Sequence, residues 1–159
     1  MPAKNAPIVL LVEDSPDEID FARRALARGG IAHRLVVAEQ GDRALALLTG
    51  EAVEPGYATP LRPSLVLLDL NIPGTAGQDV LRRIKGEPEL CSIPVVILST
   101  SEHRWDIEGC YRAHANSYHS KSDDLTRYQA TARRIVEYWL SAVVPPPVVS
   151  EQCEPSVAL

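Results

Sequence analysis

Features that mark several large classes of protein are missing from this sequence. No apolar stretch is long enough to span a membrane, and residues 1–7 lack the apolar core of a signal peptide. Basic residues form no patch and the formal net charge is -5, so the composition does not favour nucleic-acid binding. We therefore expect a cytoplasmic protein that binds neither membranes nor nucleic acids.

Cysteine is scarce as well. Cys91, Cys110 and Cys153 lack the spacing of a metal site, and without a secretory signal we expect them to be reduced thiols. The chain has 159 residues, of which 45% are hydrophobic, and this suits one soluble domain with a substantial core. No internal repeat is visible, and we expect no output domain after the last predicted helix.

Short apolar runs are present, and two of them end at carboxylates. Residues 65–68 are too few for a helix and too apolar for a surface loop, which is typical of a strand buried on both faces. Asp69 follows this run directly. Residues 8–12 form a second such run, which ends at Glu13 and Asp14. An acid at the carboxyl end of a buried strand lies where open α/β sheets place their ligands.

Strand and helix patterns alternate along the chain. This alternation predicts a parallel sheet, whose strands all have their carboxyl ends at one edge. The expected strands are residues 8–12, 35–38, 65–68, 95–98 and 117–119, and a helical pattern follows each of them, the third over about 76–85 and the fourth over about 103–115.

The first and last helices carry the clearest signals. In the first, Ser15 can cap the helix, Pro16 suits its first turn, and Glu18 completes a capping box with Ser15. The last helix begins after residues 122–124 and has an amphipathic pattern. Its expected core stripe consists of Leu125, Tyr128, Ala132, Ile135, Trp139 and Leu140.

Two segments interrupt the alternation. Residues 49–63 are rich in glycine and proline and predict a loop, which is long for a compact domain. It is either a flexible insertion or a contact surface. Pro145, Pro146 and Pro147 cannot continue a helix, so we expect one domain over residues 1–144 and a mobile tail over residues 145–159.

Polar side chains follow four of the expected strands and should meet at one edge of the sheet. They are Glu13 and Asp14, Asp69, Thr100, and Lys121. Three carboxylates close together repel one another unless a cation such as Mg2+ or Mn2+ lies between them. With the metal and Lys121 offsetting charge, Asp69 could receive a phosphoryl group, and the Thr100 hydroxyl could bind one of its oxygens.

Each of these residues alone has an ordinary explanation. Thr100 could be a turn residue, Lys121 a solvated side chain, and the acid pair a favourable charge at a helix N-terminus. What favours a functional site is that all of them follow successive strands.

Four motifs carry a resemblance to a known family. They are Leu-Leu-Val-Glu-Asp followed by Ser15, Leu-Leu-Asp-Leu-Asn-Ile-Pro-Gly, Val-Ile-Leu-Ser-Thr-Ser, and Ser-Tyr-His-Ser-Lys. In this combination they are specific, and from residue 8 to residue 140 the chain resembles the receiver domain of two-component response regulators. The resemblance implies a flavodoxin-like α/β fold, with a five-stranded parallel sheet in the order 2-1-3-4-5 and five flanking helices.

The resemblance also implies roles for individual residues. Asp69 would be the phosphoacceptor and Lys121 would bind the phosphate. Glu13, Asp14, Asp69 and the backbone carbonyl of Asn71 would bind Mg2+ or Mn2+.

Further positions would control the response to the phosphoryl group. Thr100 would be the switch hydroxyl and Tyr118 the switch aromatic residue. Asn71 and Glu102, each two residues beyond Asp69 or Thr100, would tune the water that removes the phosphoryl group.

The resemblance is closest to the small stand-alone regulators that are paired with bacterial phytochromes. The Tyr118-x-x-Lys121 ending, the Leu-Ser-Thr-Ser run and the closing Glu-Tyr-Trp-Leu carry it. We expect a phosphorelay switch that accepts its phosphoryl group from a histidine kinase and signals through altered protein contacts. Its only reactions would be self-phosphorylation from small donors and self-dephosphorylation.

One position departs from the family pattern. Most receivers have a proline after the lysine, in a cis peptide bond, whereas Ser122 follows Lys121 here. A cis bond before serine would cost roughly 2.5–4 kcal/mol. We therefore expect a trans bond and a rearranged turn into the last helix.

Two other functions remain open at this point. A phosphohydrolase of the haloacid dehalogenase type would also use an aspartyl-phosphate, but it needs a second acid where this chain has Asn71. An unphosphorylated receiver-like scaffold would not need the full acid set together with Thr100 and Lys121.

Apolar residues outside the expected core stripe predict an interface. Val136, Tyr138 and Val143 lie partly off that stripe, as does Leu140 at its end, and Trp105 stands near the start of the fourth helix. Exposed aromatic residues are enriched at interfaces, and two-fold pairing is the commonest assembly. We expect a homodimer through the fourth helix, fifth strand and fifth helix, with kinase docking on this face as the alternative.

Overall fold

The computed structural model of the chain describes residues 3–147. The expected mobile tail therefore lies outside the described residues from position 148 onward. The strands are β1 (Ile8–Val12), β2 (Arg34–Ala38), β3 (Leu65–Leu68), β4 (Val95–Ser99) and β5 (Ser117–Ser120). The helices are α1 (Pro16–Arg28), α2 (Gly41–Thr49), α3 (Gly77–Gly86), α4 (Arg104–Arg112) and α5 (Leu125–Glu137), with a π-helical end at Tyr138–Ala142.

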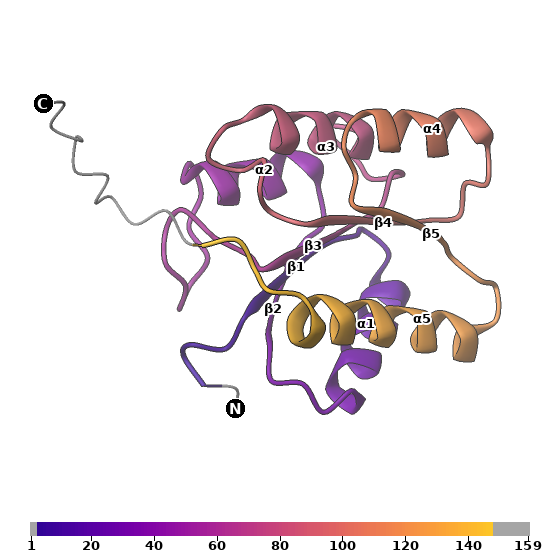
Figure 1. Ribbon diagram of the computed structural model, residues 1–159, viewed down its shortest axis with the longest axis horizontal. Coiled ribbons are helices and arrows are strands. Elements are labelled where there is room, and N and C mark those ends of the chain that lie inside the picture. Colours follow the sequence, from indigo (N-terminus) through magenta and orange to yellow (C-terminus); the bar gives the residue numbers. More distant parts are fainter. Residues whose placement is uncertain (1–2, 148–159) are drawn as a thin grey trace, which may run out of the picture.

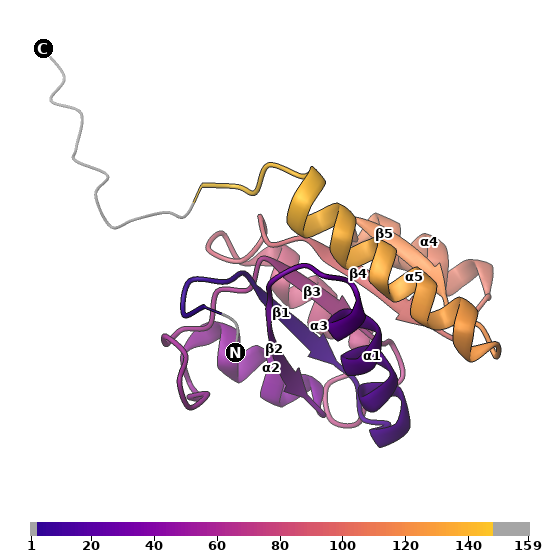
Figure 2. The ribbon, with the colours of Figure 1, turned by 90° about the horizontal axis from the view of Figure 1, so that it is seen from below.

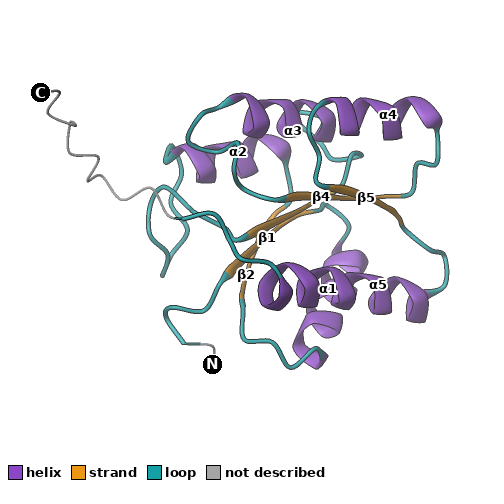
Figure 3. Cartoon of the chain, in the orientation of Figure 1, coloured by secondary structure: helices purple, strands orange, loops and turns teal. Residues whose placement is uncertain are grey.

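The five strands form one parallel sheet in the order β2-β1-β3-β4-β5, which confirms the predicted fold. Helices α2, α3 and α4 cover one face of the sheet, and α1 and α5 cover the other (Figures 1 and 3). Seen from below, α1 and α5 lie side by side across the sheet (Figure 2). The carboxyl ends of all the strands consequently meet at one edge.

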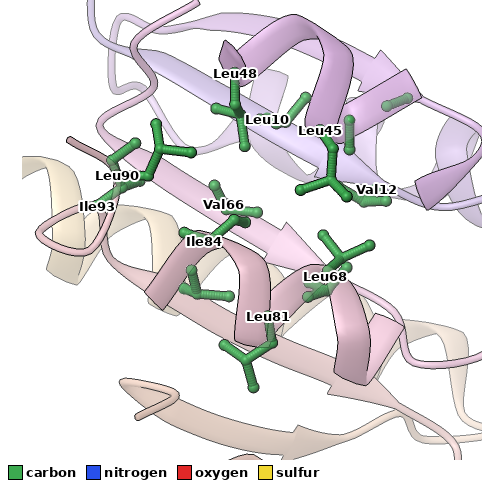
Figure 4. Close-up of a cluster of buried hydrophobic side chains, with 14 of the residues drawn as sticks. Leu10, Val12, Leu45, Leu48, Val66, Leu68, Leu81, Ile84, Leu90 and Ile93 are labelled. Carbon is green, nitrogen blue, oxygen red and sulfur yellow. The ribbon is translucent and has the colours of Figure 1, made fainter. Parts of the chain in front are cut away.

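Two hydrophobic clusters form the core, one on each face of the sheet. Successive side chains of a strand point to opposite faces. Leu10 and Leu68 accordingly belong to the cluster under α2 and α3, which Figure 4 shows, whereas Val9 and Leu67 belong to the cluster under α1 and α5. Fully burying one such side chain contributes about 1.5–3 kcal/mol, so this double-sided burial explains the continuous apolar runs.

Two predicted helix boundaries differ from the observed ones. Helix α4 ends at Arg112 rather than near residue 115, because His114 adopts a left-handed conformation with φ 67°. Helix α5 ends at Glu137 as an α-helix, and Tyr138–Ala142 continue it as a π-helical turn.

The predicted core stripe of α5 needs two corrections. Leu125 is 42% exposed, and residues 124–127, which are the N-cap and the start of the helix, are all exposed. Val136 is only 2% exposed, although its place beside the stripe suggested a surface position. The packed face therefore begins one turn later than predicted, at Tyr128, and includes Val136.

The predicted capping box at the start of α1 forms only in part. The Ser15 Oγ accepts a hydrogen bond from the Glu18 N–H at 3.5 Å, as predicted. The reciprocal bond is absent, because the Ser15 N–H donates to Glu13 Oε1 at 3.0 Å. The Glu18 carboxylate contacts Lys121 instead.

The long loop over residues 49–63 is packed against α2. The Leu61 N–H donates to the Leu47 carbonyl at 2.9 Å, and Leu61 is buried. Arg43 of α2 binds Glu54 of the loop at 2.9 Å. These contacts attach both halves of the loop to the helix before it.

The predictions about membranes and thiols can be compared with residues 3–147. Within that range, none of the helices combines the length and the apolar character needed to cross a bilayer. Cys91 and Cys110 are free thiols, and burial raises the pKa of Cys110 to about 11. Cys153 lies outside the described residues.

Candidate functional site

The predicted acids meet at the carboxyl edge of the sheet. Glu13, Asp14 and Asp69 each offer a carboxylate oxygen, and these oxygens lie within 4.8 Å of one another. Glu13 and Asp69 are buried, whereas Asp14 is exposed. The Asp69 N–H donates to the Val12 carbonyl at 3.0 Å, so the pairing of β1 with β3 fixes the position of the Asp69 backbone. We call Glu13, Asp14 and Asp69 the acidic trio.

Lys121 projects into the acidic trio from the end of β5. Its N–H donates to the Ser99 carbonyl at 2.8 Å, and its side chain is 5% exposed. The ammonium lies 2.5 Å from Glu13 Oε2 and 2.8 Å from Asp69 Oδ2, and it also contacts the Glu18 carboxylate. An ammonium has three donors, and a buried charge requires such partners.

The close packing of charge shifts the ionisation of the buried groups. Burial raises the pKa of Glu13 to about 7, and a hydrogen bond with Glu18 acts in the same direction against the attraction of Lys121. Burial alone would lower the pKa of Lys121, but hydrogen bonds to Asp69, Glu13 and Glu18 raise it above its usual value. Lys121 therefore stays positively charged, whereas the pKa of Glu13 lies close to neutral pH.

A glycine lets α3 approach the backbone at Asp69. A Cβ atom on Gly77 would lie 2.3 Å from the Asp69 carbonyl oxygen, which is far too close. The Gly77 N–H donates to the Leu70 carbonyl at 3.1 Å. On the other side, the Asn71 N–H donates to Asp69 Oδ1 at 3.1 Å. The Asp69 carboxylate thus lies between Lys121 and a backbone amide.

The two predicted switch residues come from the end of β4 and from within β5. Thr100 is exposed and directly follows the last residue of β4. The Tyr118 hydroxyl donates to the Ser101 carbonyl at 2.6 Å, and its ring packs against the cluster under α2 and α3. Burial raises the pKa of Tyr118, so its hydroxyl stays protonated and can donate.

The two remaining predicted residues, Asn71 and Glu102, both have exposed side chains. Asn71 is tied to Asp69 through its backbone, as described above, and Glu102 lies in the loop between β4 and α4. The structure thus places the predicted site residues at the carboxyl edge of the sheet or in a loop that follows it, except Tyr118, which is the second residue of β5.

Comparison with known proteins identifies the family. Residues 9–133 match the response regulator receiver domain. The chain belongs to this family. It is 37% identical over 139 residues to the response regulator Rcp1 of Synechocystis sp.. The alignment covers 87% of this chain and 92% of Rcp1.

Solved structures agree with this assignment. The phosphorylated cyanobacterial phytochrome response regulator RcpA matches with a TM-score of 0.81 and 39% identity, covering 89% of this chain and 99% of RcpA. The Mn2+-bound form of Rcp1 matches with a TM-score of 0.81 and 36% identity, over 89% of this chain and 99% of Rcp1. This receiver is therefore homologous to phytochrome response regulators, as its motifs indicated.

The receiver departs from the usual pattern after Lys121, as predicted. Among residues 3–147 the cis peptide bond is the one between Thr59 and Pro60, so the bond before Ser122 is trans. The Ser122 Oγ accepts from the Asp124 N–H at 3.1 Å, and Asp124 Oδ1 accepts from the Arg127 N–H at 3.1 Å. Two side-chain caps therefore build the turn into α5.

Sequence reasoning missed Glu18 as a residue of the site, and it missed that the charges of the site act on the buried Tyr128. Glu18 was predicted to cap α1, but its carboxylate contacts Lys121, and its pKa is lowered because hydrogen bonds with Glu13 and Lys121 outweigh the effect of burial. Tyr128 was predicted only as a core residue. Burial raises the pKa of Tyr128 to about 12, while nearby Lys121 acts in the opposite direction. The available signal for Glu18 was an acid in a first turn that follows a site strand.

A separate groove of about 540 Å³ lies at the opposite edge of the sheet. It is next to the start of β2, where Arg34 donates to the carbonyls of Lys4 and Gly56 and lies 3.9 Å from the Tyr57 ring centroid. These contacts attach the N-terminal segment and the 49–63 loop to the sheet. The groove lies away from the acidic trio and has no part in its chemistry.

Proposed function

We propose that this receiver is a phosphorelay switch that accepts a phosphoryl group on Asp69 from a histidine kinase. The observation that carries the proposal is that the Asp69 carboxylate lies 2.8 Å from the Lys121 ammonium and within 4.8 Å of carboxylate oxygens of Glu13 and Asp14. Rcp1 is a response regulator, and RcpA is a cyanobacterial phytochrome response regulator. We therefore propose a kinase of the phytochrome type as the donor, acting in the cytoplasm on the domain formed by residues 1–144.

The donor set of the site suits a hard divalent cation. Carboxylate and carbonyl oxygens are the ligands that Mg2+ and Mn2+ prefer, and the three carboxylates of the acidic trio need a positive charge between them. Glu13, Asp14, Asp69 and the backbone carbonyl of Asn71 would hold the ion. When bound, it would offset negative charge on the oxygens of the transferring group.

The side chains of this receiver would perform the remaining steps. A carboxylate oxygen of Asp69 attacks phosphorus, a P–O bond forms, and the bond to the nitrogen of the kinase histidine or to the oxygen of a small donor breaks. Lys121 offsets charge on the phosphoryl oxygens during the transfer. Hydrolysis of the acyl phosphate restores the carboxylate. The receiver would carry out only this self-phosphorylation and self-dephosphorylation.

Thr100 and Tyr118 would transmit the change to the surface. The new oxygens on Asp69 can accept a hydrogen bond from the Thr100 hydroxyl, which would draw Thr100 inward. Tyr118 already holds the Ser101 carbonyl next to Thr100, so movement of this loop would act on the ring. Structures with and without beryllofluoride test the coupling, because identical Tyr118 rotamers in both would contradict it.

A homodimer would respond to the change at Thr100 and Tyr118. Two of the apolar residues predicted for this interface have exposed side chains, Trp105 at 83% and Tyr138 at 57%, whereas Val136 is buried. Leu140 and Val143 are half-buried. Strand β5 lies at the edge of the sheet between α4 and α5, with none of its four residues fully buried. We propose a two-fold dimer through the α4–β5–α5 face, meaning residues 104–143 on these three elements.

The test of the proposed function is direct. The full chain is incubated with acetyl phosphate and Mg2+ and is then weighed intact at neutral pH. A single phosphoryl adduct that depends on Mg2+ is expected for a phosphorelay switch. A chain that remains unmodified would instead support the receiver-like scaffold.

A further inference from the structure

Lys121 contacts three carboxylates, and one of them is not part of the acidic trio. Glu13 and Asp69 bind the ammonium from the ends of β1 and β3, at 2.5 and 2.8 Å. Glu18 binds the same ammonium from the first turn of α1. The side chain of Glu18 is 31% exposed and that of Lys121 is 5% exposed, so Glu18 covers the solvent side of a buried charge.

The proposed function would change the other two partners. Glu13 and Asp69 would give oxygens to the divalent cation, and one oxygen of Asp69 would be bonded to phosphorus. Both changes withdraw negative charge from Lys121. Because an ammonium that is buried without partners is costly, a carboxylate outside the acidic trio would hold it in place.

We propose that Glu18 is a positioning residue for Lys121. It anchors the ammonium beside Asp69 in the metal-bound and phosphorylated states, when Glu13 and Asp69 are engaged elsewhere. This inference rests on the proposed function, and it adds a residue to the machinery that the family motifs describe.

The start of α1 fixes Glu18 in a position suited to this task. Its backbone N–H is held by Ser15, and the next residue, Ile19, is buried under α1. Its carboxylate is not used for capping, because Glu13 Oε1 already accepts from the Ser15 N–H. Helix α1 packs along α5, which follows Lys121. The anchor therefore lies on α1, and Lys121 lies in the short connection that leads into the helix packed against α1.

The charge of Glu18 makes the inference testable. The acidic trio, a divalent cation and Lys121 sum to zero charge, and Glu18 adds one negative charge. By charge alone, Glu18 would repel an incoming phosphoryl donor, so removing it would speed the reaction. As an anchor for Lys121 it has the opposite effect, because a loosened ammonium stabilises the transferring group less well. The two roles predict opposite changes in rate.

The first measurement observes Lys121 itself. The lysines of the chain are Lys4, Lys85 and Lys121, so the 15N NMR spectrum of the ammonium groups is simple to assign. With Mg2+ and beryllofluoride, we expect a protected Lys121 signal in the wild type and in Asp17→Ala, an exposed first-turn acid that serves as the matched control. We expect that signal to be lost in Glu18→Ala and restored in Glu18→Asp.

Lys85 provides an internal control for folding. Its ammonium donates to the carbonyls of Cys91 and Ile93 and to Asn116 Oδ1, at 3.1, 2.7 and 3.0 Å. A retained Lys85 signal shows that a variant is folded. Glu18→Gln, which keeps an acceptor oxygen and removes the charge, serves as the second variant if Glu18→Ala loses that signal.

The second measurement is the rate of phosphorylation by acetyl phosphate at saturating Mg2+. We expect the maximal rate constant to fall about tenfold or more in Glu18→Ala, with less change in Glu18→Gln and none in Asp17→Ala. The donor concentration at half-maximal rate should stay the same. A folded Glu18→Ala that keeps the Lys121 signal and the wild-type rate would overturn the inference, and so would a faster rate. If the wild type takes up no phosphate, the proposed function fails, while the Lys121 signal in Mg2+ alone still tests the anchor.

Discussion

The carboxyl edge of the sheet and the α4–β5–α5 face differ in how they treat polar and aromatic groups. At the edge, Lys121 and Asp69 have side chains that are 5% and 10% exposed, and each is hydrogen-bonded. On the face, Trp105 and Tyr138 are 83% and 57% exposed. Charged side chains are buried at the edge, whereas aromatic side chains are exposed on the face. The edge is thus suited to chemistry and the face to contacts with other molecules.

The largest expected effect is at the edge, at the phosphoacceptor. We expect Asp69→Asn to take up no phosphoryl group from acetyl phosphate and Mg2+, because an amide is not a nucleophile of this kind. The variant should remain folded, since an amide oxygen can still accept from the Asn71 N–H. Intact mass at neutral pH measures the adduct. Asp20→Asn on the exposed side of α1 is the matched control and should be phosphorylated normally. A full adduct on Asp69→Asn would show that another residue is the acceptor.

A second effect at the edge is a pH dependence of the unfolding free energy, which we expect from Glu13. Burial, with a hydrogen bond to Glu18, raises its pKa from 4.5 to about 7. A carboxyl group with a higher pKa in the folded chain stabilises the fold fully below its unfolded pKa, and this contribution is lost as the pH rises through the folded pKa. Relative to Glu13→Gln, the metal-free wild type should lose about 2 kcal/mol of unfolding free energy between about pH 5 and about pH 7.5.

Urea titrations at the two pH values measure this difference. Added Mg2+ should restore the stability of the wild type at the higher pH, because a bound cation stabilises the ionised acidic trio. Parallel pH profiles for the wild type and Glu13→Gln would mean that Glu13 is ionised without a penalty in the folded chain.

Smaller effects are expected on the face. The variant Trp105→Ala, Tyr138→Ala, Val143→Asp should stay folded and should associate at least about tenfold more weakly, because exposed aromatic residues contribute to interfaces and little to the core. Light scattering at several concentrations measures the assembly, with and without beryllofluoride. Val53→Asp, at an exposed residue outside this face, is the control. A wild type that is monomeric at high concentration under both conditions would rule out the dimer.

The same two regions differ in how well the sequence predicted them. The apolar runs of β1 and β3 are buried on both faces, so every residue carries the signal, and both strands were predicted with their observed bounds. Helix α5 buries only a stripe. One turn at its exposed start was enough to misplace Leu125, and the stripe is wider than predicted, which misplaced Val136. An amphipathic pattern alone does not show at which residue the buried stripe of a helix begins or how wide it is.

The site shows a second limit of sequence reasoning. The acids and Lys121 could be placed because a parallel sheet brings strand ends together whatever the loops do. The contact between Glu18 and Lys121 joins residues 103 positions apart in the chain, on a helix and a strand end. Local capping rules gave Glu18 a different partner. Only the packing of α1 beside α5 shows which one it has.

The smallest expected effect lies at the border between the two regions, in the loops that carry Asn71 and Glu102. Both side chains are exposed, in the loops that follow β3 and β4, and from there they could orient the water that attacks the acyl phosphate. Replacing both with bulky apolar residues, Asn71→Leu and Glu102→Leu, should slow phosphoryl loss by about tenfold, because they would exclude that water and could not orient it. Uptake should change little, since neither side chain binds Asp69 or Lys121 in the structure. The phosphoryl lifetime is measured by intact mass after the donor is removed. Glu51→Leu, on an exposed residue after α2, controls for a general effect of a surface leucine. An unchanged lifetime in the double variant would show that these two side chains do not tune the rate of hydrolysis.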